Sequence, residues 1–182
     1  MMDKHEIRKA VKALKKQLTP EQRTEAAARA MAAVEALPQF AAAERVLVYH
    51  SLPDELSTIA FIERWAERKQ LYLPRVNGDD LDILAYDPKQ LATGAFNIAE
   101  PTGGELVDPE RIELVIVPAV AYDRRGNRIG RGKGYYDRLL RRTRALKVGV
   151  AYQCQICDDF TPDEFDIPVD IVITDQGIIK SV

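Results

Sequence analysis

The sequence predicts an α/β fold with three layers: an open, largely parallel sheet with helices on both faces, as in Rossmann-like proteins. Short apolar runs rich in β-branched residues are typical of buried strands, and they occur at residues 45–49, 112–118, 146–151 and 169–174. Stretches with helical spacing of apolar residues alternate with these runs, and alternating strands and helices favour a parallel sheet. A turn and a short strand at residues 177–179 could make the sheet mixed.

Length and composition favour one domain spanning residues 1–182. The 26 basic and 28 acidic residues give a net charge of −2, which argues against a nucleic-acid binder held by bulk electrostatics. No apolar run approaches the roughly 20 residues of a membrane span, and the charged N-terminus does not resemble a secretory signal. We therefore expect a cytoplasmic monomer with no membrane or nucleic-acid partner.

Two helices are predicted in the first 40 residues. The first covers residues 3–18 and places apolar side chains on one face. Its other face carries the cations Lys4, Arg8, Lys12 and Lys15, for which a solvated helix face is the simplest explanation. Thr19 and Gln22 form a capping box around Pro20, so a second helix is expected to begin there and to end near Leu37.

The predicted strand at residues 45–49 is followed directly by two polar candidates. In an open parallel sheet, ligands gather beyond the carboxyl ends of the strands, where His50 and Glu55 would stand. Taken singly, His50 is more simply explained as an ordinary surface histidine, and Glu55 as a carboxylate at the approach to a helix.

The segment from Ser57 to residue 101 predicts further elements. Ser57 or Thr58 can cap the next helix. The expected elements are this helix to about residue 68, strands at 71–74 and 81–86 around a turn at 77–80, and an irregular segment at 96–101.

The most distinctive stretch is Gly126–Arg138, which lies between a predicted strand and a helix expected over residues 135–142. Its glycines let the backbone adopt positive φ and approach a phosphate closely. The N-terminus of the following helix offers unpaired N–H groups and a positive dipole end to an anion.

Side chains of the same stretch add charge. Arg128, Arg131 and Lys133 suit phosphate oxygens, and Asp137 could hold a divalent cation. The spacing is neither that of a P-loop, because Gly134 follows Lys133, nor G-x-G-x-x-G. A mobile turn with solvated cations is the alternative interpretation.

Cys154 and Cys157 form a C-x-x-C pair. No second cysteine pair is present, and the pair follows a late strand, so a zinc site or a catalytic dithiol is poorly supported. Small buried apolar side chains are the simpler interpretation.

The stretch Gly126–Asp137 resembles the signature loop of the 5-formyltetrahydrofolate cyclo-ligase family, also called methenyltetrahydrofolate synthetases. Lys4-x-x-x-Arg8 is similar to the family's ATP-contacting element, and Ser51-x-x-x-Glu55-x-x-Thr58 to its folate-binding segment. Further similarity lies at Asn97–Pro101, where Asn97 replaces the usual glycine, at Val148–Gln155, and at Phe165–Asp170.

The resemblance implies an ATP- and Mg²⁺-dependent ligase of one-carbon folate metabolism that converts 5-formyltetrahydrofolate to 5,10-methenyltetrahydrofolate, releasing ADP and phosphate. The implied route is phosphorylation of the formyl oxygen and ring closure by N10. The implied ATP contacts are Lys4, His5, Glu6, Ile7, Arg8, Arg128, Ile129, Gly130, Arg131, Gly132, Lys133, Gly134, Tyr135 and Tyr136. The implied folate contacts are His50, Glu55, Arg131, Lys133, Gly134 and Tyr135; Asp137 and Asp166 are implied metal ligands, and Arg131 and Lys133 catalytic residues.

Three other interpretations stay open. One is a different phosphate-handling α/β protein, such as a sugar-phosphate isomerase or a CoA-transferase relative. Another is a regulatory module that binds a nucleotide or folate without turnover. A dinucleotide oxidoreductase fits least, because both the spacing and the late position of the glycines are wrong for it.

Overall fold

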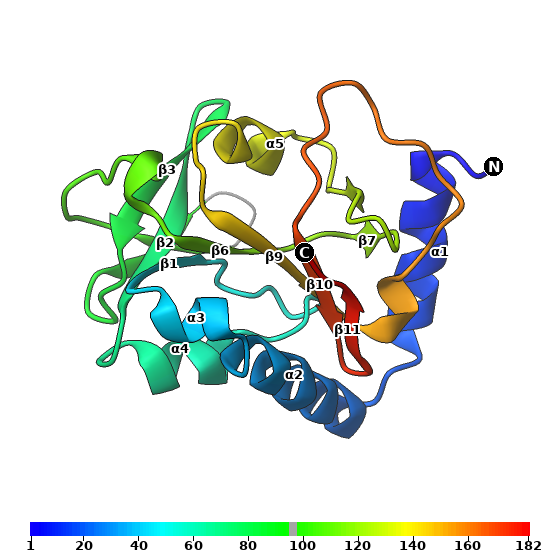
Figure 1. Ribbon diagram of the computed structural model, residues 1–182, viewed down its shortest axis with the longest axis horizontal. Coiled ribbons are helices and arrows are strands. Elements are labelled where there is room, and N and C mark those ends of the chain that lie inside the picture. The colour runs from blue at the N-terminus through cyan, green and yellow to red at the C-terminus, as the bar shows by residue number, and fades with distance from the viewer. Residues whose placement is uncertain (95–97) are drawn as a thin grey trace.

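The computed structural model describes residues 1–94 and 98–182 and is built around a seven-stranded sheet, ordered β11-β10-β9-β6-β1-β2-β3 (Figure 1). The strands are β1 Arg45–Val48, β2 Gln70–Asn77, β3 Asp80–Ala85, β6 Leu114–Val117, β9 Leu146–Ala151, β10 Ile171–Thr174 and β11 Gly177–Lys180. The five inner strands pair in parallel, whereas β3 and β11 pair antiparallel with their neighbours at the two edges. The largely parallel sheet and its C-terminal hairpin are confirmed.

The order of the parallel strands marks where a ligand is expected to bind. In chain order these strands are arranged 2-1-3-4-5 across the sheet, so the direction of the connections reverses between β1 and β6. Open α/β sheets bind ligands beyond the carboxyl ends of the strands at such a switch point. The segment with His50 and Glu55 follows β1, and the Gly-rich stretch follows β6.

Helices cover both faces of the sheet, as predicted (Figure 1). On one face lie α2 (Pro20–Glu35), α3 (Pro38–Ala42) and α4 (Ile59–Trp65), and on the other lies α5 (Tyr135–Leu140). Successive side chains of β1 pack on opposite faces of the sheet. Val46 and Val48 pack in the core with α2, α3 and α4, whereas Leu47 packs in the core with α5.

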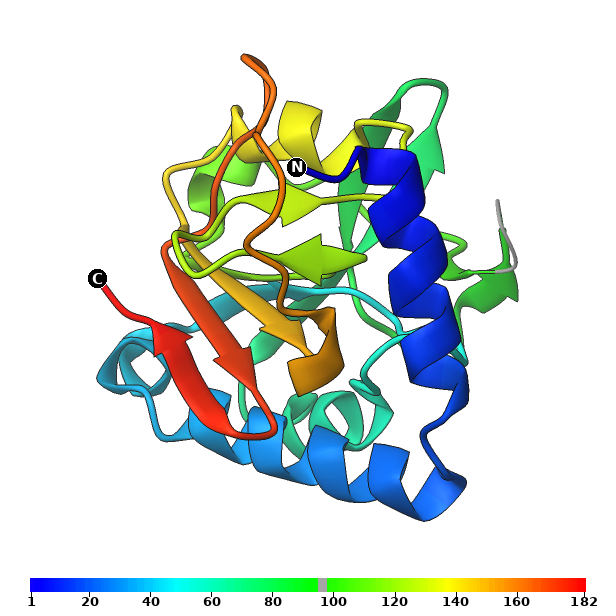
Figure 2. The same ribbon diagram turned by 90° about the vertical axis from the view of Figure 1, so that its right-hand side faces the viewer.

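The helix α1 (Lys4–Lys16) packs on the short hairpin of β7 (Ala121–Tyr122) and β8 (Arg128–Ile129), as Figure 2 shows. Ile7 and Val11 of α1, Ala121 and Ile129 of the hairpin, and Phe160 of the segment after the 3-10 helix η3 (Gln153–Gln155) form a small core of their own. The helix therefore holds the hairpin from which the Gly-rich stretch begins.

The N-termini of α2 and α4 agree differently with the predicted helix caps. The Thr19 capping box is confirmed, since Thr19 Oγ1 accepts from Gln22 N–H at 3.1 Å and Gln22 Oε1 accepts from Thr19 N–H at 2.9 Å. For α4, the side-chain cap predicted at Thr58 is wrong, whereas Ser57 Oγ accepts from the N–H of Ile59, the first residue of the helix, at 3.4 Å. Thr58 occupies the N-cap position but donates its hydroxyl to the Tyr49 carbonyl at 2.6 Å, so a tertiary contact replaces the cap.

Other differences concern short elements. The segment at 96–101 was expected to be irregular, but its end forms the strand β5 (Ala99–Pro101). This strand pairs with β4 (Leu91–Thr93), so the expectation is wrong there. Neither α3 nor the β7–β8 hairpin was predicted, and two 3-10 helices lie at η2 (Pro109–Arg111) and η3 (Gln153–Gln155). Asn97 lies outside the described residues. In the part of the chain that the structure describes, no helix has the length and apolar character needed to cross a membrane.

Candidate active site

The turn between β7 and β8 is fixed by a buried carboxylate. Asp123 Oδ1 accepts from the N–H groups of Arg125 and Asn127, both at 2.8 Å, and Oδ2 accepts from Asn127 Nδ2 at 2.7 Å. Gly126 has φ 91°, and a Cβ there would lie 2.4 Å from the Val169 carbonyl oxygen. The first glycine of the stretch is therefore required for packing.

Beyond β8 the chain turns into α5 through two glycines with positive φ. Gly132 has φ 105°, and Gly134, the N-cap of α5, has φ 71°. A Cβ on Gly134 would lie 2.8 Å from Arg138 Nη1, and Arg138 Nη2 donates to the Lys133 carbonyl at 2.8 Å. The predicted order of strand, Gly-rich loop and helix is confirmed, with the β7–β8 hairpin inserted within it.

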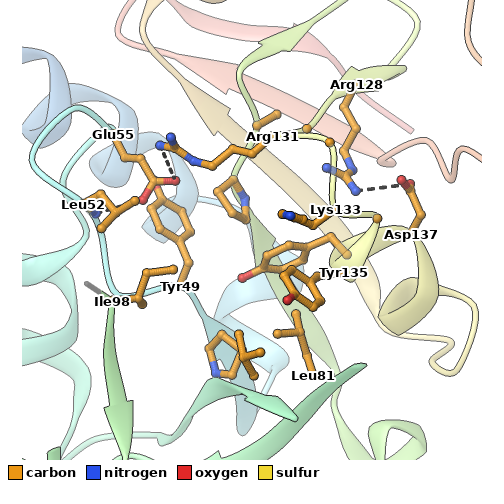
Figure 3. Close-up of a pocket in the computed structure, with 18 of the residues that line it drawn as sticks. Tyr49, Leu52, Glu55, Leu81, Ile98, Arg128, Arg131, Lys133, Tyr135 and Asp137 are labelled. Atoms are coloured by element: carbon orange, nitrogen blue, oxygen red, sulfur yellow. Dashed lines mark hydrogen bonds and ion pairs between the residues drawn. The ribbon is translucent and has the colours of Figure 1, made fainter. Parts of the chain in front are cut away.

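A cavity of about 540 Å³ opens at the expected switch point (Figure 3). Its walls come from α1, the segment after β1, strands β2 and β3, Ile98 and the buried Glu100 at β5, the segment after β6, the Gly-rich loop and residues 163–166. The predicted site residues that line it are Lys4, Arg8, His50, Glu55, Arg128, Gly130, Arg131, Gly132, Lys133, Gly134, Tyr135, Tyr136, Asp137 and Asp166. Residues up to 162 positions apart in the sequence thus contribute to one cavity.

Four of the predicted ATP contacts do not line this cavity. Ile7 and Ile129 are each 1% exposed in the small core under α1. Glu6 closes the capping box of α1 with Asp3, and His5 is exposed to solvent. Any contact of these residues with a nucleotide stays a prediction.

At one end of the cavity, which we call the phosphate end after the anion-binding role predicted for its Gly-rich loop, α1 is tied to two other segments. Lys4 Nζ lies 2.6 Å from Asp163 Oδ2 and 2.8 Å from Asp166 Oδ2. Burial acts to lower the pKa of Lys4, but the two carboxylates raise it overall. Arg8 Nε donates to the Gly130 carbonyl at 2.9 Å, which joins α1 directly to the Gly-rich loop.

Arg128 and Asp137 form a second charged group at the phosphate end, shown by the dashed line in Figure 3. Arg128 Nη2 lies 3.1 Å from Asp137 Oδ1, which also accepts from the Ile167 N–H at 3.0 Å. The Arg128 side chain is 4% exposed, its guanidinium lies over the Tyr136 ring, and its Nε has no hydrogen-bond partner among the described residues. A buried donor of this kind is costly unless an acceptor reaches it.

The opposite end, which we call the folate end after the contact predicted for Glu55, holds a largely buried carboxylate. Glu55 Oε1 accepts from the Leu52 N–H at 2.8 Å, and its side chain is 14% exposed. Burial raises the pKa of Glu55, although the Leu52 N–H and the nearby Arg131 act against that rise. Burial also lowers the pKa of His50, so its imidazole is neutral at pH 7.

The folate end is otherwise largely apolar. The Tyr49 hydroxyl is turned away to donate to the Leu56 carbonyl at 2.6 Å, which leaves the ring as wall. The remaining apolar wall is Leu52, Pro74, Val76, Leu81, Ile98 and Pro118, with the rings of Tyr135 and Tyr136. The β2 and β3 residues were not predicted to belong to the site; their only signal was their place on β2, beside β1, and on β3, beside β2.

Arg131 lies between the two ends (Figure 3). Its Nη2 is 3.0 Å from Asp54 Oδ1 and 3.8 Å from Glu55 Oε2. Asp54 in turn contacts Lys15. Neither Asp54 nor a contact to Lys15 was predicted.

Cys154 and Cys157 pack in different places. Cys154 lies against the core that contains α2, and Cys157 against the small core under α1. Neither thiol lines the cavity. This placement agrees with the interpretation of both as small apolar side chains.

Comparisons with known proteins agree with the geometry. The family model described as "5-formyltetrahydrofolate cyclo-ligase family" matches residues 1–175. The 5-formyltetrahydrofolate cyclo-ligase of Escherichia coli strain K12 is 33% identical over 171 residues, covering 88% of this chain and 94% of its own. The structure of Aquifex aeolicus 5,10-methenyltetrahydrofolate synthetase has a TM-score of 0.89 at 38% identity and covers 97% of this chain and 92% of its own. The Mycoplasma pneumoniae synthetase shares the fold, with a TM-score of 0.77 at 23% identity over 96% of this chain and 99% of its own.

Proposed function

The chain belongs to the 5-formyltetrahydrofolate cyclo-ligase family, and we propose that it converts 5-formyltetrahydrofolate and ATP to 5,10-methenyltetrahydrofolate, ADP and phosphate. The observation that carries this proposal is one cavity with two unlike ends. Glycine backbone and cations line one end, and apolar walls with a buried carboxylate line the other. A nucleotide phosphate and a heterocyclic ring fit these ends respectively, and they would meet beside Arg131.

The reaction needs such a meeting point because an N-formyl amide is a poor electrophile. Transfer of the γ-phosphoryl group of ATP to the formyl oxygen creates a good leaving group. N10 then attacks the formyl carbon, loses its proton, and the C–O bond breaks as phosphate departs with the bonding electrons. Enzymes accelerate phosphoryl transfer mainly by positioning and by stabilising charge.

The phosphate end supplies the groups for that stabilisation. Arg131 and Lys133 would neutralise charge on the transferring phosphoryl group, and Lys4 and Arg8 would close over the phosphates from α1. Arg128 Nε, which has no hydrogen-bond partner in the described part of the chain, would gain an acceptor if a phosphate oxygen reached it, which supports Arg128 as part of the nucleotide site.

The folate end supplies recognition. Glu55 would accept hydrogen bonds from the pterin N–H groups, and a neutral His50 can donate with one ring nitrogen and accept with the other. The apolar walls would exclude water from the reacting formyl group, and the pterin could stack on the Tyr135 ring.

Asp137 and Asp166 fit a Mg²⁺ ion chemically, because both are carboxylates at the phosphate end. Among the described residues, no group of three or more His, Cys, Asp or Glu side chains is placed to hold a metal. One or two carboxylates with substrate phosphates as further ligands are usual for Mg²⁺, so the pair suffices. Held by these two carboxylates, the ion would offset the negative charge of the phosphate groups. Asp137 would then exchange part of its contact with Arg128, and Asp166 part of its contact with Lys4.

One assay tests the proposal. Purified protein is mixed with 5-formyltetrahydrofolate, ATP and Mg²⁺, and methenyl absorbance is followed together with ADP. We expect both products in equal amounts and only when all components are present. ADP without methenyl product would assign the site to another acceptor, and binding of both ligands without turnover would favour a regulatory binding module.

A further inference from the structure

Asp54 joins three segments that are distant in the sequence. It follows β1, and its carboxylate contacts Lys15 in the last turn of α1 and Arg131 in the Gly-rich loop. Lys15 Nζ lies 3.2 Å from Asp54 Oδ2 and also donates to the Asp54 carbonyl at 3.0 Å. Arg131 Nη2 donates to both carboxylate oxygens of Asp54, to Oδ1 at 3.0 Å and to Oδ2 at 3.3 Å, so Lys15 and Arg131 share Oδ2.

The two cations that Asp54 contacts differ in freedom. The Lys15 side chain is 7% exposed, so its ammonium group is fixed by burial and by its two contacts with Asp54. The Arg131 side chain is 48% exposed and extends from a loop between glycines, so little packing restricts it. A carboxylate anchored to a buried lysine can therefore fix the position of an otherwise mobile guanidinium.

We propose that Asp54 is a positioning residue that holds the Arg131 guanidinium at the boundary between the phosphate and folate ends, with Lys15 as its buried anchor. The inference rests on the proposed function, because it concerns how Arg131 reaches the transferring phosphoryl group. Asp54 itself does not line the cavity, so its effect on the reaction passes through Arg131.

The alternative carboxylate for Arg131 shows why position matters. Glu55 Oε2 lies 3.8 Å from Arg131 Nη2, farther than Asp54 Oδ1. Without the charge of Asp54, Arg131 would shift towards Glu55, which is the carboxylate offered to the pterin. Loss of Asp54 would therefore misplace a catalytic cation and occupy a folate-binding group at the same time.

The test is a double-mutant cycle on the full-length protein. Asp54→Asn keeps the shape of the side chain and removes its charge. We expect kcat to fall by on the order of ten-fold, as for other misplaced catalytic groups, with a higher KM for folate and little change in the KM for ATP. In an Arg131→Ala background, the same substitution should change kcat by less than about two-fold, because its effect requires Arg131.

Two further variants complete the design. Asp158→Asn is the matched control, since Asp158 forms a comparable exposed ion pair with Arg124 outside the cavity, and it should retain the parent's activity. Asp54→Glu keeps the charge, should recover part of the lost kcat, and takes the place of Asp54→Asn in the cycle if thermal melting shows that the latter does not fold.

Each outcome decides the proposal. Unchanged kinetics in Asp54→Asn, or an equal loss with and without Arg131, would overturn the positioning role while leaving the cyclo-ligase reaction intact. A parent protein that forms no methenyl product would instead overturn the proposed function, and the positioning role with it. Loss in the single variant only, with recovery in Asp54→Glu, supports the proposal.

Discussion

The two ends of the cavity hold charge in opposite ways. At the phosphate end, Asp137, Asp163 and Asp166 each lie within 3.1 Å of a cationic nitrogen of Arg128 or Lys4. At the folate end, burial dominates the two titratable side chains: it raises the pKa of Glu55 and lowers the pKa of His50. Compensated charges can be exchanged for phosphate and metal, whereas groups in an apolar setting select a ligand by hydrogen bonds.

The boundary between the ends falls between two neighbouring residues. Burial acts to raise the pKa of Asp54, but Lys15 and Arg131 lower it overall. For Glu55 the effect of burial prevails and its pKa is raised. The sequence neighbours thus differ because Asp54 faces two cations and Glu55 faces the apolar cavity.

The largest effect is expected from breaking the phosphate end. Arg131→Ala and Lys133→Ala should each lower kcat by roughly 10²–10³-fold, the cost of removing a donor aimed at developing charge. Both side chains are at the surface, so the thermal midpoint should stay close to that of the parent. Steady-state kinetics with Arg124→Ala as control measure this, and an unchanged kcat in both variants would remove these residues from the chemistry.

The next largest expected effect is on the Mg²⁺ dependence of the reaction rate. Asp137→Asn removes a carboxylate charge while leaving an oxygen for the Ile167 N–H. The Mg²⁺ concentration for half-maximal rate at fixed ATP should rise by at least about ten-fold. Asp159→Asn, an exposed carboxylate beside the N-terminus, is the control. A titration curve for Asp137→Asn that superimposes on that of the parent would show that Asp137 is not a ligand.

The folate end should respond selectively. Glu55→Gln keeps an acceptor for the Leu52 N–H but loses the charge offered to the pterin. The KM for folate should rise by about ten-fold, as for loss of a hydrogen bond to a charged group, while the KM for ATP changes little. Glu67→Gln, on the exposed surface, is the control. Equal rises in both KM values would contradict a division of the cavity into two ends.

The smallest expected effect is on the free energy of unfolding, and it has opposite signs for substitutions of Glu55 and Asp54. The folded-state pKa of Glu55 lies above its unfolded value, so ionising Glu55 lowers stability as pH rises through that raised pKa. Glu55→Gln should therefore be more stable than the parent at pH 7, with the gain disappearing in acid. The folded-state pKa of Asp54 is lowered, so its contribution is present above the unfolded pKa and is lost as pH falls through the folded one.

Asp54→Asn should consequently be less stable at pH 7, by roughly 0.2–1 kcal/mol, the range for exposed ion pairs. Urea unfolding of the parent and both variants, at pH 7 and again in mild acid, measures the two signs. If both variants were more stable than the parent at pH 7, or both less stable, the contrast between Asp54 and Glu55 would be contradicted.

Local signals predicted most of the fold and part of the site. The Thr19 capping box and the apolar runs depend on residues close in sequence, and the structure bears them out. The cap at Thr58 failed because its hydroxyl has a distant competitor in the Tyr49 carbonyl. Asp54 and Pro74 were missed for the same reason, since their roles arise from neighbours distant in the sequence that no local pattern reveals.

The transfer of a phosphoryl group to the formyl oxygen is the central claim, and an isotope measurement tests it most directly. The parent protein is given ATP, Mg²⁺ and 5-formyltetrahydrofolate labelled with ¹⁸O in the formyl group, and the released phosphate is analysed by mass spectrometry. The account requires one ¹⁸O atom in each phosphate released per methenyl product. Unlabelled phosphate formed together with methenyl product would contradict it, because ATP would then be cleaved without its phosphoryl group ever reaching the folate.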